Sequence, residues 1–447
     1  MARMNVKTKA DQVFTHEGGK AVSGLRSIEQ LKRSILACFL WEGEFYEDGQ
    51  SIADRIVATA EKCAPEEVAA LAVTARKVHN LRHAPLLLLR VLAKTGAGKP
   101  GLVADAIEQT ISRADELAEF LSIYMSDKRQ PLSGQVKKGL AKAFGKFDEY
   151  ALAKYDRAGK YRLRDVLFLC HAKPKDAEQK ALWERLINNE LKTPDTWEVA
   201  LSGGADKKEA FEGLLREGKL GYLALLRNLR NMEQAGVDRD LIKATLLARK
   251  GAQRVLPFRY VAAARAAPQL EPIIDQALCE AIQELPPLKG HTAVLVDVSG
   301  SMDHVLSSRS DMKRIDAAAA LASIINVDGE LTVATFSEGL AIVPPRRGMA
   351  GVDAVIRSQP HSGTYLGKAI ATLEQVMEQK KRSIDRLIVI TDEQSHDTVG
   401  APAAKLAYLI NVASAQNGVG YRNGWTHIDG FSEGVLKYIH ATEAEAV

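Results

Sequence analysis

The segment Thr292–Met302, TAVLVDVSGSM, decides the fold of the second part of the chain. Its first half is a run of apolar and β-branched residues without alternation, which is typical of a parallel strand buried on both faces. Short polar side chains follow at once, in the place where ligand sites form in open α/β sheets. The segment therefore predicts the first strand of an α/β sheet with a polar site at its carboxyl end.

Downstream, strand patterns alternate with helix patterns. We expect further strands at 330–336, 385–391 and 406–412, and helices at 312–326, 351–357, 364–379, 400–406 and 432–440. This alternation predicts a doubly wound, Rossmann-like sheet. The loop ELPPLKG at 284–290 has the composition of a linker, so we place this domain at 290–447.

Upstream, residues 27–285 form one amphipathic pattern after another, separated by short Gly, Pro, Asp or Asn breaks. The first, at 27–41, puts Leu31, Ile35, Cys38 and Phe39 on one helix face. Further helices are expected at 51–63, 65–78, 84–95, 100–111, 113–126, 133–145, 147–157, 161–171, 176–190, 206–216, 219–234, 239–249 and 271–284. Short helices in such a series predict a helical-repeat domain at 1–289, although no fixed sequence period is visible.

The composition excludes several classes of protein. The chain has 447 residues, of which 46% are hydrophobic and 26% charged, which excludes global disorder. No apolar run approaches the ~18 residues that a membrane span needs, and the first residues lack the apolar core of a secretory signal. Four scattered cysteines argue against a disulfide framework or a zinc knuckle. We therefore expect a cytoplasmic protein that does not contact a membrane.

The charge is distributed unevenly. Residues 1–290 hold 46 Lys and Arg against 38 Asp and Glu, whereas residues 291–447 hold 14 against 18. Two runs, 128–147 and 241–270, each contain six basic residues and no acidic one. Such runs attract phosphates by counterion release, although a solvated helix face is the alternative for either run alone. The first run makes Lys137, Lys138 and Lys142 candidate RNA-binding residues.

A set of oxygen-bearing side chains follows the predicted strands. Asp297, Ser299 and Ser301 form a DxSxS pattern, Thr364 lies in SGTYL before a helix, and Asp392 ends LIVITDEQ. Hard oxygen ligands suit Mg²⁺, whereas DxSxS alone can also be a capped helix start. The order of these residues resembles the metal-ion-dependent adhesion site (MIDAS) of von Willebrand factor A domains. The resemblance implies that the two serines and the threonine bind the metal directly, and that a partner's acidic residue completes the site. It also implies that the two aspartates act through water or support the metal ligands from behind.

The helical part resembles a second known domain. Its segments are ALLRNL at 224–229, the Pro257–Phe258 pair, and the His171, Lys173 and Pro174 of HAKPK. Together they are similar to the TROVE domain of the Ro60/Rsr family, here as a bacterial member. The resemblance implies a ring of HEAT-like helical repeats followed by a von Willebrand A domain. It also implies a non-enzymatic protein of RNA quality control, which binds Y-like non-coding RNA outside the ring and single-stranded 3′ ends of misfolded RNA in its hole.

The same resemblance suggests individual RNA-binding residues. The family has a Lys-Tyr pair 17 positions before the His of its H-x-K-P motif, and Lys154, Tyr155 and His171 have this spacing. Lys154 would contact phosphate, and His171 would bind phosphate or a base edge. Tyr155 would stack on a base or, equally, pack in the core. The nearby basic residues that could extend the patch are Arg157, Arg162, Arg164 and Lys173.

Other functions fit the sequence less well. TGAGKP at 95–100 lacks the first Gly and the Ser/Thr of a phosphate-binding loop. No two-metal carboxylate cluster supports a nuclease, so RNA decay would need an exoribonuclease recruited through the RNA. One alternative stays open: a metal-dependent protein-binding adaptor whose helical part is only a scaffold. The basic runs favour RNA binding over this alternative.

Overall fold

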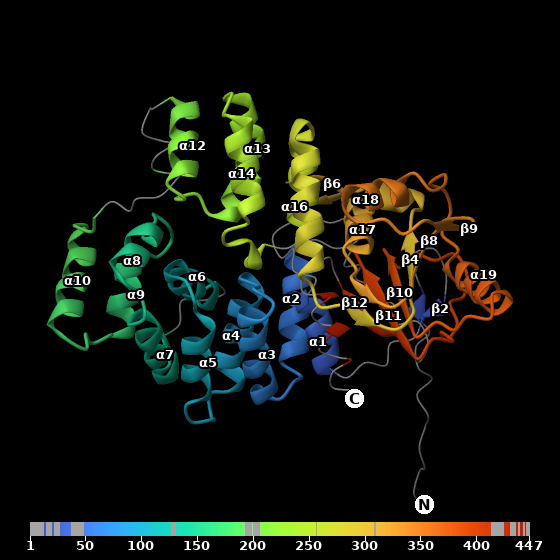
Figure 1. Ribbon diagram of the computed structural model, residues 1–447. Coiled ribbons are helices and arrows are strands. Elements are labelled where there is room, and N and C mark those ends of the chain that lie inside the picture. Colours follow the sequence, from blue (N-terminus) through green and yellow to red (C-terminus); the bar gives the residue numbers. More distant parts are fainter. Residues whose placement is uncertain are drawn as a thin grey trace, which may run out of the picture. The chain divides into compact units, whose positions relative to one another are not determined.

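The fold is taken from a computed structural model, which describes residues 13–14, 20–21, 27–36, 49–126, 131–192, 206–255, 257–307, 310–412 and 424–429 and the isolated positions 199, 435–436, 439–440 and 443. Figure 1 shows two kinds of architecture, a long series of helices and a sheet with covering helices. The chain divides into two compact units, whose longest segments are Asp48–Ala281 for the helices and Ile282–Phe431 for the sheet.

The first unit is a succession of helices (Figure 1). They are α1 (Ser27–Leu36), α2 (Gly49–Ala60), α3 (Pro65–Lys77), α4 (His83–Thr95), α5 (Leu102–Thr110), α6 (Ala114–Tyr124), α7 (Gly134–Phe144), α8 (Glu149–Tyr155), α9 (Leu163–Cys170), α10 (Ala177–Asn188), α12 (Lys207–Arg216), α13 (Tyr222–Gln234), α14 (Arg239–Ala248), α15 (Pro257–Ala266) and α16 (Glu271–Gln283). Short 3-10 turns, η1 (Ala252–Arg254) and η2 (Pro268–Leu270), flank α15.

These helices pack in a repeating way. In one row α1 contacts α3, α3 contacts α5, α5 contacts α7 and α7 contacts α9. In a second row α2 contacts α4, α4 contacts α6 and α6 contacts α8. Later in the chain α12 contacts α14, and α13 contacts α15. Most of these helices therefore pack on the next but one, which is the arrangement of a helical-repeat domain and confirms that prediction.

Local sequence signals explain where the helices start. Pro65 occupies the first turn of α3, as predicted, because its missing N–H needs no partner there. Side chains of Ser133, Asp148 and Asp176 accept hydrogen bonds from free backbone N–H groups of α7, α8 and α10. Each predicted helix from 51–63 to 271–284 is present within a few residues of its expected bounds. Of the predicted helix at 27–41, residues 37–41 lie outside the described part of the chain.

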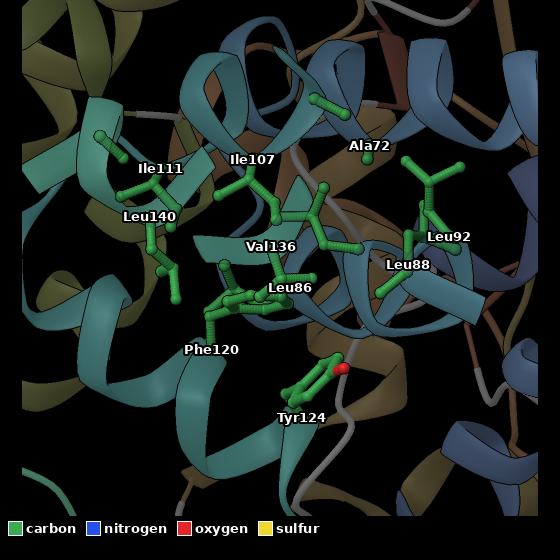
Figure 2. Packing of buried hydrophobic residues seen from close by; sticks show 14 of the residues in the cluster. Ala72, Leu86, Leu88, Leu92, Ile107, Ile111, Phe120, Tyr124, Val136 and Leu140 are labelled. Atoms are coloured by element: carbon green, nitrogen blue, oxygen red, sulfur yellow. The ribbon is translucent and has the colours of Figure 1, made fainter. Parts of the chain in front are cut away.

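The core of this unit consists of the apolar faces of its helices. Figure 2 shows Leu88 and Leu92 of α4, Ile107 of α5, and Val136 and Leu140 of α7 pointing into one interior, and all five are fully buried. At ~25 cal/mol per Å² of buried apolar surface, such a layer is the main stabilising contribution of the unit. The helices α5 and α7 approach very closely at Gly139, where a Cβ would lie 2.8 Å from the carbonyl oxygen of Ala104.

The second unit contains a six-stranded sheet in the order β12-β11-β10-β4-β8-β9. Its strands are β4 (Thr292–Asp297), β8 (Leu331–Phe336), β9 (Leu340–Val343), β10 (Arg386–Thr391), β11 (Leu406–Asn411) and β12 (Thr426–Asp429). All neighbours are parallel except β8 and β9. The helices are η3 (Gly300–Asp303), α17 (Arg314–Ser323), α18 (Gly348–Ile356) and α19 (Leu366–Gln379). Short strands also form two-stranded sheets: β1 (Val13–Phe14) with β2 (Lys20–Ala21), β3 (Leu288–Lys289) with β7 (Val327–Asp328), and β5 (Val305–Ser307) with β6 (Ser310–Lys313).

The register of the sheet places the predicted polar site. The central strand β4 is buried along its whole length and pairs with β10 on one side and β8 on the other. Val296 is opposite Ile390, so Asp297 at the end of β4 lies beside the last residues of β10. The carboxyl ends of parallel strands meet at one edge, and DxSxS and Asp392 therefore share that edge.

Two sequence-based expectations for this unit differ from the structure. Residues 400–405 form no helix, because Pro402 and Gly400 interrupt the pattern and the backbone N–H of Ala403 donates instead to Glu374. The strands β9 and β12 were not expected from the sequence. The predicted last helix at 432–440 lies mostly outside the described residues.

None of the described helices is both long and apolar enough to serve as a transmembrane span.

Candidate functional site

The first aspartate of DxSxS is held rigidly at the end of β4. The side chain of Asp297 is completely buried. Its Oδ1 accepts a hydrogen bond from the backbone N–H of Ser299 at 2.9 Å, and its Oδ2 accepts one from the Thr391 hydroxyl at 2.6 Å. Burial, together with the neighbouring Asp392 carboxylate, raises the pKa of Asp297 to about 7. A buried carboxyl with this pKa is a group that a cation would stabilise in its charged form.

Ser299 and Ser301, the remaining DxSxS residues, lie between Asp297 and Asp392 and connect the two carboxyl groups. The hydroxyls of Ser299 and Ser301 lie 3.2 Å apart, and Ser301 is close enough to Asp392 to oppose the rise in the pKa of that carboxyl. Asp392 is also completely buried, and burial raises the pKa of its carboxyl. Its Oδ2 lies 3.4 Å from Nη1 of Arg314, which is itself buried. Four of the five predicted metal-site residues therefore belong to one connected group.

Thr364, the fifth residue, comes from the loop before α19. It is buried, and its backbone N–H and carbonyl both lie within hydrogen-bonding distance of Nδ1 of His396, at 3.2 and 3.0 Å. The carbonyl of Ser362, two residues earlier, accepts a hydrogen bond from Gly300 at 2.9 Å and so ties this loop to the DxSxS turn. Among the described residues no hydrogen bond joins the Thr364 hydroxyl directly to the other four side chains.

The chemistry of this group fits a hard divalent cation. It offers three hydroxyls and two carboxyls, the oxygen ligands that Mg²⁺ prefers. Oδ1 of Asp392 is buried and has no hydrogen-bond partner in the described structure, so one strong acceptor is left for a further ligand. Among the described residues, no cluster of three or more His, Cys, Asp or Glu forms a different metal site. The residues present therefore fit the group that the sequence pattern predicted.

The predicted RNA-binding residues 154–173 lie on α8, on the turn between α8 and α9, on α9, and on the segment that follows α9. This stretch and the start of α8 contain three acidic residues, and each is engaged within the protein. Glu149 pairs with Arg185 at 2.9 Å, and Asp165 accepts the backbone N–H of Arg162 at 2.7 Å. Asp156 pairs with the Arg162 guanidinium. The positive charge of Arg162 is therefore already balanced.

The other basic residues of this stretch keep their charge available. Arg157, Lys160 and Lys173 are exposed, and Arg164 is half-buried on α9. Within the described part of the chain none of these four side chains forms an ion pair. Lys154 lies with its ammonium 5.6 Å from the Tyr150 ring and 5.7 Å from the Tyr155 ring, a cation–π arrangement that leaves its charge unpaired. Of these residues, the sequence analysis did not select Lys160.

The two residues with named roles differ in their surroundings. His171 follows the last residue of α9 in a left-handed conformation, with φ 53°, and its side chain is exposed. Tyr155 is half-buried against the helical core, and the guanidinium of Arg113 lies 4.6 Å from the centre of its ring. Of the two roles considered for Tyr155, this position favours packing.

The candidate RNA-binding lysines on α7 differ in whether their charge is already paired within the protein. Lys142 pairs with Asp105 at 3.0 Å and with Glu108 at 2.9 Å, both on α5. Lys146, in the same run, donates hydrogen bonds to the backbone carbonyls of Glu108 and Ile111 at the end of α5. Lys137 and Lys138 form no ion pair within the described residues. The run lacks acidic residues of its own, but the neighbouring helix supplies them.

The comparisons with known proteins match both parts of the chain. A sequence profile of the TROVE domain matches residues 188–277, and a profile of the von Willebrand factor type A domain matches residues 292–394. The chain carries a TROVE domain followed by a von Willebrand factor type A domain. The two domains that the sequence resemblance implied are thereby confirmed. Residues 154–173 lie ahead of the matched TROVE segment, so their role in RNA binding stays a prediction.

Two individual proteins are similar to this TROVE and von Willebrand A chain. The crystal structure of the Ro (Rsr) protein of Deinococcus radiodurans superposes with a TM-score of 0.65 at 18% identity, over 94% of this chain and 100% of that one. Mouse telomerase protein component 1 is 35% identical over 86 residues, which are 18% of this chain. The match spans only 3% of the length of the telomerase protein. The structural similarity confirms the predicted fold class, a helical-repeat domain followed by a von Willebrand A domain.

Some residues of both sites were not visible from the sequence. Two such residues are Arg314, which lies beside Asp392, and Lys160, which lies in the turn between α8 and α9. Arg314 is the first residue of α17, where the helix dipole disfavours a positive charge. A basic residue in that position is a signal that a carboxylate from elsewhere compensates it.

Proposed function

We propose that this TROVE and von Willebrand A protein binds RNA and does not catalyse a reaction. One observation supports this most strongly: Arg157, Lys160, Arg164 and Lys173 lie before, on and after α9 and form no ion pair among the described residues. In the same stretch, every acidic residue between 149 and 173 is engaged within the protein. Unpaired cations in a cluster hold phosphates through counterion release. His171 and Lys154 border the same stretch of chain and would add contacts to phosphates or base edges.

The finer features of the proposal come from the Ro family. The ligands would be Y-like non-coding RNA and single-stranded 3′ ends of misfolded RNA, and the cellular role would be RNA quality control, with an exoribonuclease recruited through the RNA. A ring form of the helical domain, a domain boundary at 289 and 290 and a cytoplasmic location stay predictions.

We further propose that the von Willebrand A domain holds Mg²⁺. Ser299, Ser301 and Thr364 would bind the ion directly, and Asp297 and Asp392 would hold its water ligands. When bound, the ion would offer an open coordination position to a carboxylate of a partner protein. The unpartnered Oδ1 of Asp392 supports this second role, which is compatible with RNA binding by the helical domain. It also keeps the alternative of a metal-dependent adaptor open to test.

Fluorescence anisotropy with a structured RNA and a single-stranded RNA across a salt series tests the main proposal. We expect the logarithm of the binding constant to fall linearly with the logarithm of the salt concentration. Replacing Arg157, Lys160, Arg164 and Lys173 together by Gln should reduce this slope by about 3 for single-stranded RNA, at ~0.7 per lost phosphate contact.

Lys142→Gln is the matched control, because its ammonium already pairs with Asp105 and Glu108. Its slope should equal that of the wild type. An absence of RNA binding by the wild type at low salt would exclude the proposal and leave the adaptor. A fourfold variant that binds with unchanged slope would show that the RNA lies on another surface.

A further inference from the structure

Helix α9 exposes an aromatic side chain. Phe168 is 56% exposed and its neighbour Leu169 is 37% exposed, although the other apolar residues of the helix are buried. The buried face consists of Leu163, Val166, Leu167 and Cys170. Phe168 is therefore on the opposite side of α9 from the core, and its ring contributes little to the packing of the helical unit.

The surroundings of Phe168 are cationic. Arg164 lies one helical turn before it, at the i, i+4 spacing that brings two side chains together on a helix surface. His171 follows three residues later at the end of the helix, and its side chain is exposed. Neither Arg164 nor His171 forms an ion pair among the described residues. A flat apolar ring beside unpaired cations is complementary to a ligand with flat rings and negative charges.

The neighbouring aromatic residues are less suited to such a ligand. The guanidinium of Arg113 lies over the Tyr155 ring, and this ring packs against the core. Tyr150 is half exposed, but the ammonium of Lys154 lies 5.6 Å from its ring centre. Among the described aromatic residues of α8 and α9, Phe168 has the most exposed side chain. It also carries no polar group, so its only strong interaction with a nucleotide would be stacking.

We propose that Phe168 is a stacking platform for an unpaired base of single-stranded RNA, whose adjacent phosphates are held by Arg164 and the cations of the preceding turn. This inference rests on the proposed RNA binding and adds a specificity to it. Every base has a π-face, so the platform accepts any sequence. A paired base inside a duplex is stacked on its neighbours and cannot cover the ring, so the platform selects single strands.

The experiment compares Phe168→Ala and Phe168→Trp with the wild type. The ligands are an unstructured RNA oligonucleotide, an abasic oligonucleotide of the same length, and a blunt RNA duplex. Phe168→Ala should weaken binding of the unstructured RNA about tenfold, equivalent to ~1.4 kcal/mol, and leave the other two ligands unchanged. Its salt slope should equal that of the wild type, because no phosphate contact is lost.

Phe168→Trp should keep the affinity, and its added tryptophan fluorescence should be quenched by the unstructured RNA but not by the abasic oligonucleotide. Leu223→Ala is the matched control, because Leu223 is 40% exposed on α13, in another part of the helical unit. Circular dichroism of each variant shows whether the fold is retained.

Three outcomes would overturn the platform. If Phe168→Ala binds unstructured RNA as the wild type does, the exposed ring serves another ligand, such as a protein partner, while the proposed RNA binding stands. If Phe168→Ala weakens binding of the abasic and the unstructured RNA equally, the ring supports the RNA-binding surface but does not stack on a base. If the wild type binds none of the three ligands, the proposed function fails together with the inference.

Discussion

Nη1 of Arg314 lies 3.4 Å from Oδ2 of Asp392, and both side chains are almost completely buried. The guanidinium thus compensates a carboxylate in the group that we expect to hold Mg²⁺. A buried ion pair is costly to break, because the remaining charge stays in a medium of low dielectric constant.

Replacing Arg314 by Met should therefore destabilise the von Willebrand A domain by ~3–5 kcal/mol in the absence of divalent ions. Saturating Mg²⁺ should recover a large part of this loss, because the ion supplies positive charge beside Asp392. Thermal unfolding with and without Mg²⁺ measures both effects. Arg357→Gln is the control, since Arg357 is 80% exposed and its pair with Asp353 contributes little. A loss that is the same at every Mg²⁺ concentration would contradict this expectation.

Replacing Asp297 by Asn should abolish the stabilisation by Mg²⁺ and leave RNA affinity unchanged. The amide keeps the size of the side chain but offers only one of the two acceptors that Ser299 and Thr391 now use. We expect a loss of ~1–2 kcal/mol in the free energy of unfolding, measured by denaturant titration. Asp328→Asn, at an exposed position, serves as the control. Loss of RNA binding by a folded Asp297→Asn protein would show that the two functions are coupled.

Replacing Lys154 and His171 together by Ala should weaken RNA binding without unfolding the helical domain. Neither side chain belongs to the buried core, and the contacts of Lys154 with Tyr150 and Tyr155 are weak at this exposure. Each lost phosphate contact should lower the affinity severalfold and flatten the salt dependence. Anisotropy titrations measure the affinity, and melting curves report the fold. Wild-type affinity in this variant would remove both residues from the RNA site.

Two helical glycines should respond in opposite ways to alanine. At Gly139 a Cβ would lie 2.8 Å from both the Ala104 carbonyl oxygen and the Ile107 Cβ, so Gly139→Ala should destabilise the protein by ~1–3 kcal/mol. At Gly213 a Cβ meets no atom within 4 Å, so Gly213→Ala should stabilise it by ~0.5–1 kcal/mol. Calorimetric melting of both variants compares them directly, and equal shifts would mean that α5 and α7 are less closely packed.

The carboxylate of Glu119 should make the stability of the helical unit depend on pH. It pairs with Arg82 and with His83, each at 2.9 Å. Burial alone would raise the pKa of Glu119, but the hydrogen bond and charge of His83 and the charge of Arg82 hold it below its usual value. A lowered pKa in the folded state stabilises the protein above the unfolded-state pKa, and this contribution disappears as the pH falls through the folded-state pKa.

Glu119→Gln should therefore cost ~1 kcal/mol at pH 7, and its difference from the wild type should shrink as the pH falls from about 5 to 3. Urea unfolding at several pH values measures this difference. The exposed Glu184, 3.9 Å from Lys180 on α10, provides the control variant Glu184→Gln, which should stay close to the wild type throughout. A difference that grows toward low pH would refute the assignment.

Local patterns were sufficient for much of the fold. The uninterrupted apolar run of β4 and the amphipathic period of most helices were visible from the sequence, because burial selects the side chains on each face. The helix α15 was missed, since its segment PFRYVAAARA contains small residues that do not define a face. The edge strand β9 was missed for a related reason: its residues Leu340–Val343 do not alternate between apolar and polar.

The sites were predicted less completely than the fold, because charge partners come from distant parts of the chain. Lys142 is close in space to Asp105 and Glu108, which precede it by more than thirty residues. No composition of a local run can show that these carboxylates balance it. The same holds for Arg314 and Asp392, and for the exposure of Phe168, which depends on what packs against α9.

Lys146 belongs to a basic run that suggested contact with nucleic acid, but its ammonium group instead holds two parts of the helical unit together. Its ammonium joins two backbone carbonyls at the end of α5 and so fastens that helix to the turn after α7. Acetylation at this lysine would remove two of its donors together with its charge. The contact between α5 and the turn after α7 would then be weaker, and the helical array would bend more easily between these neighbouring repeats.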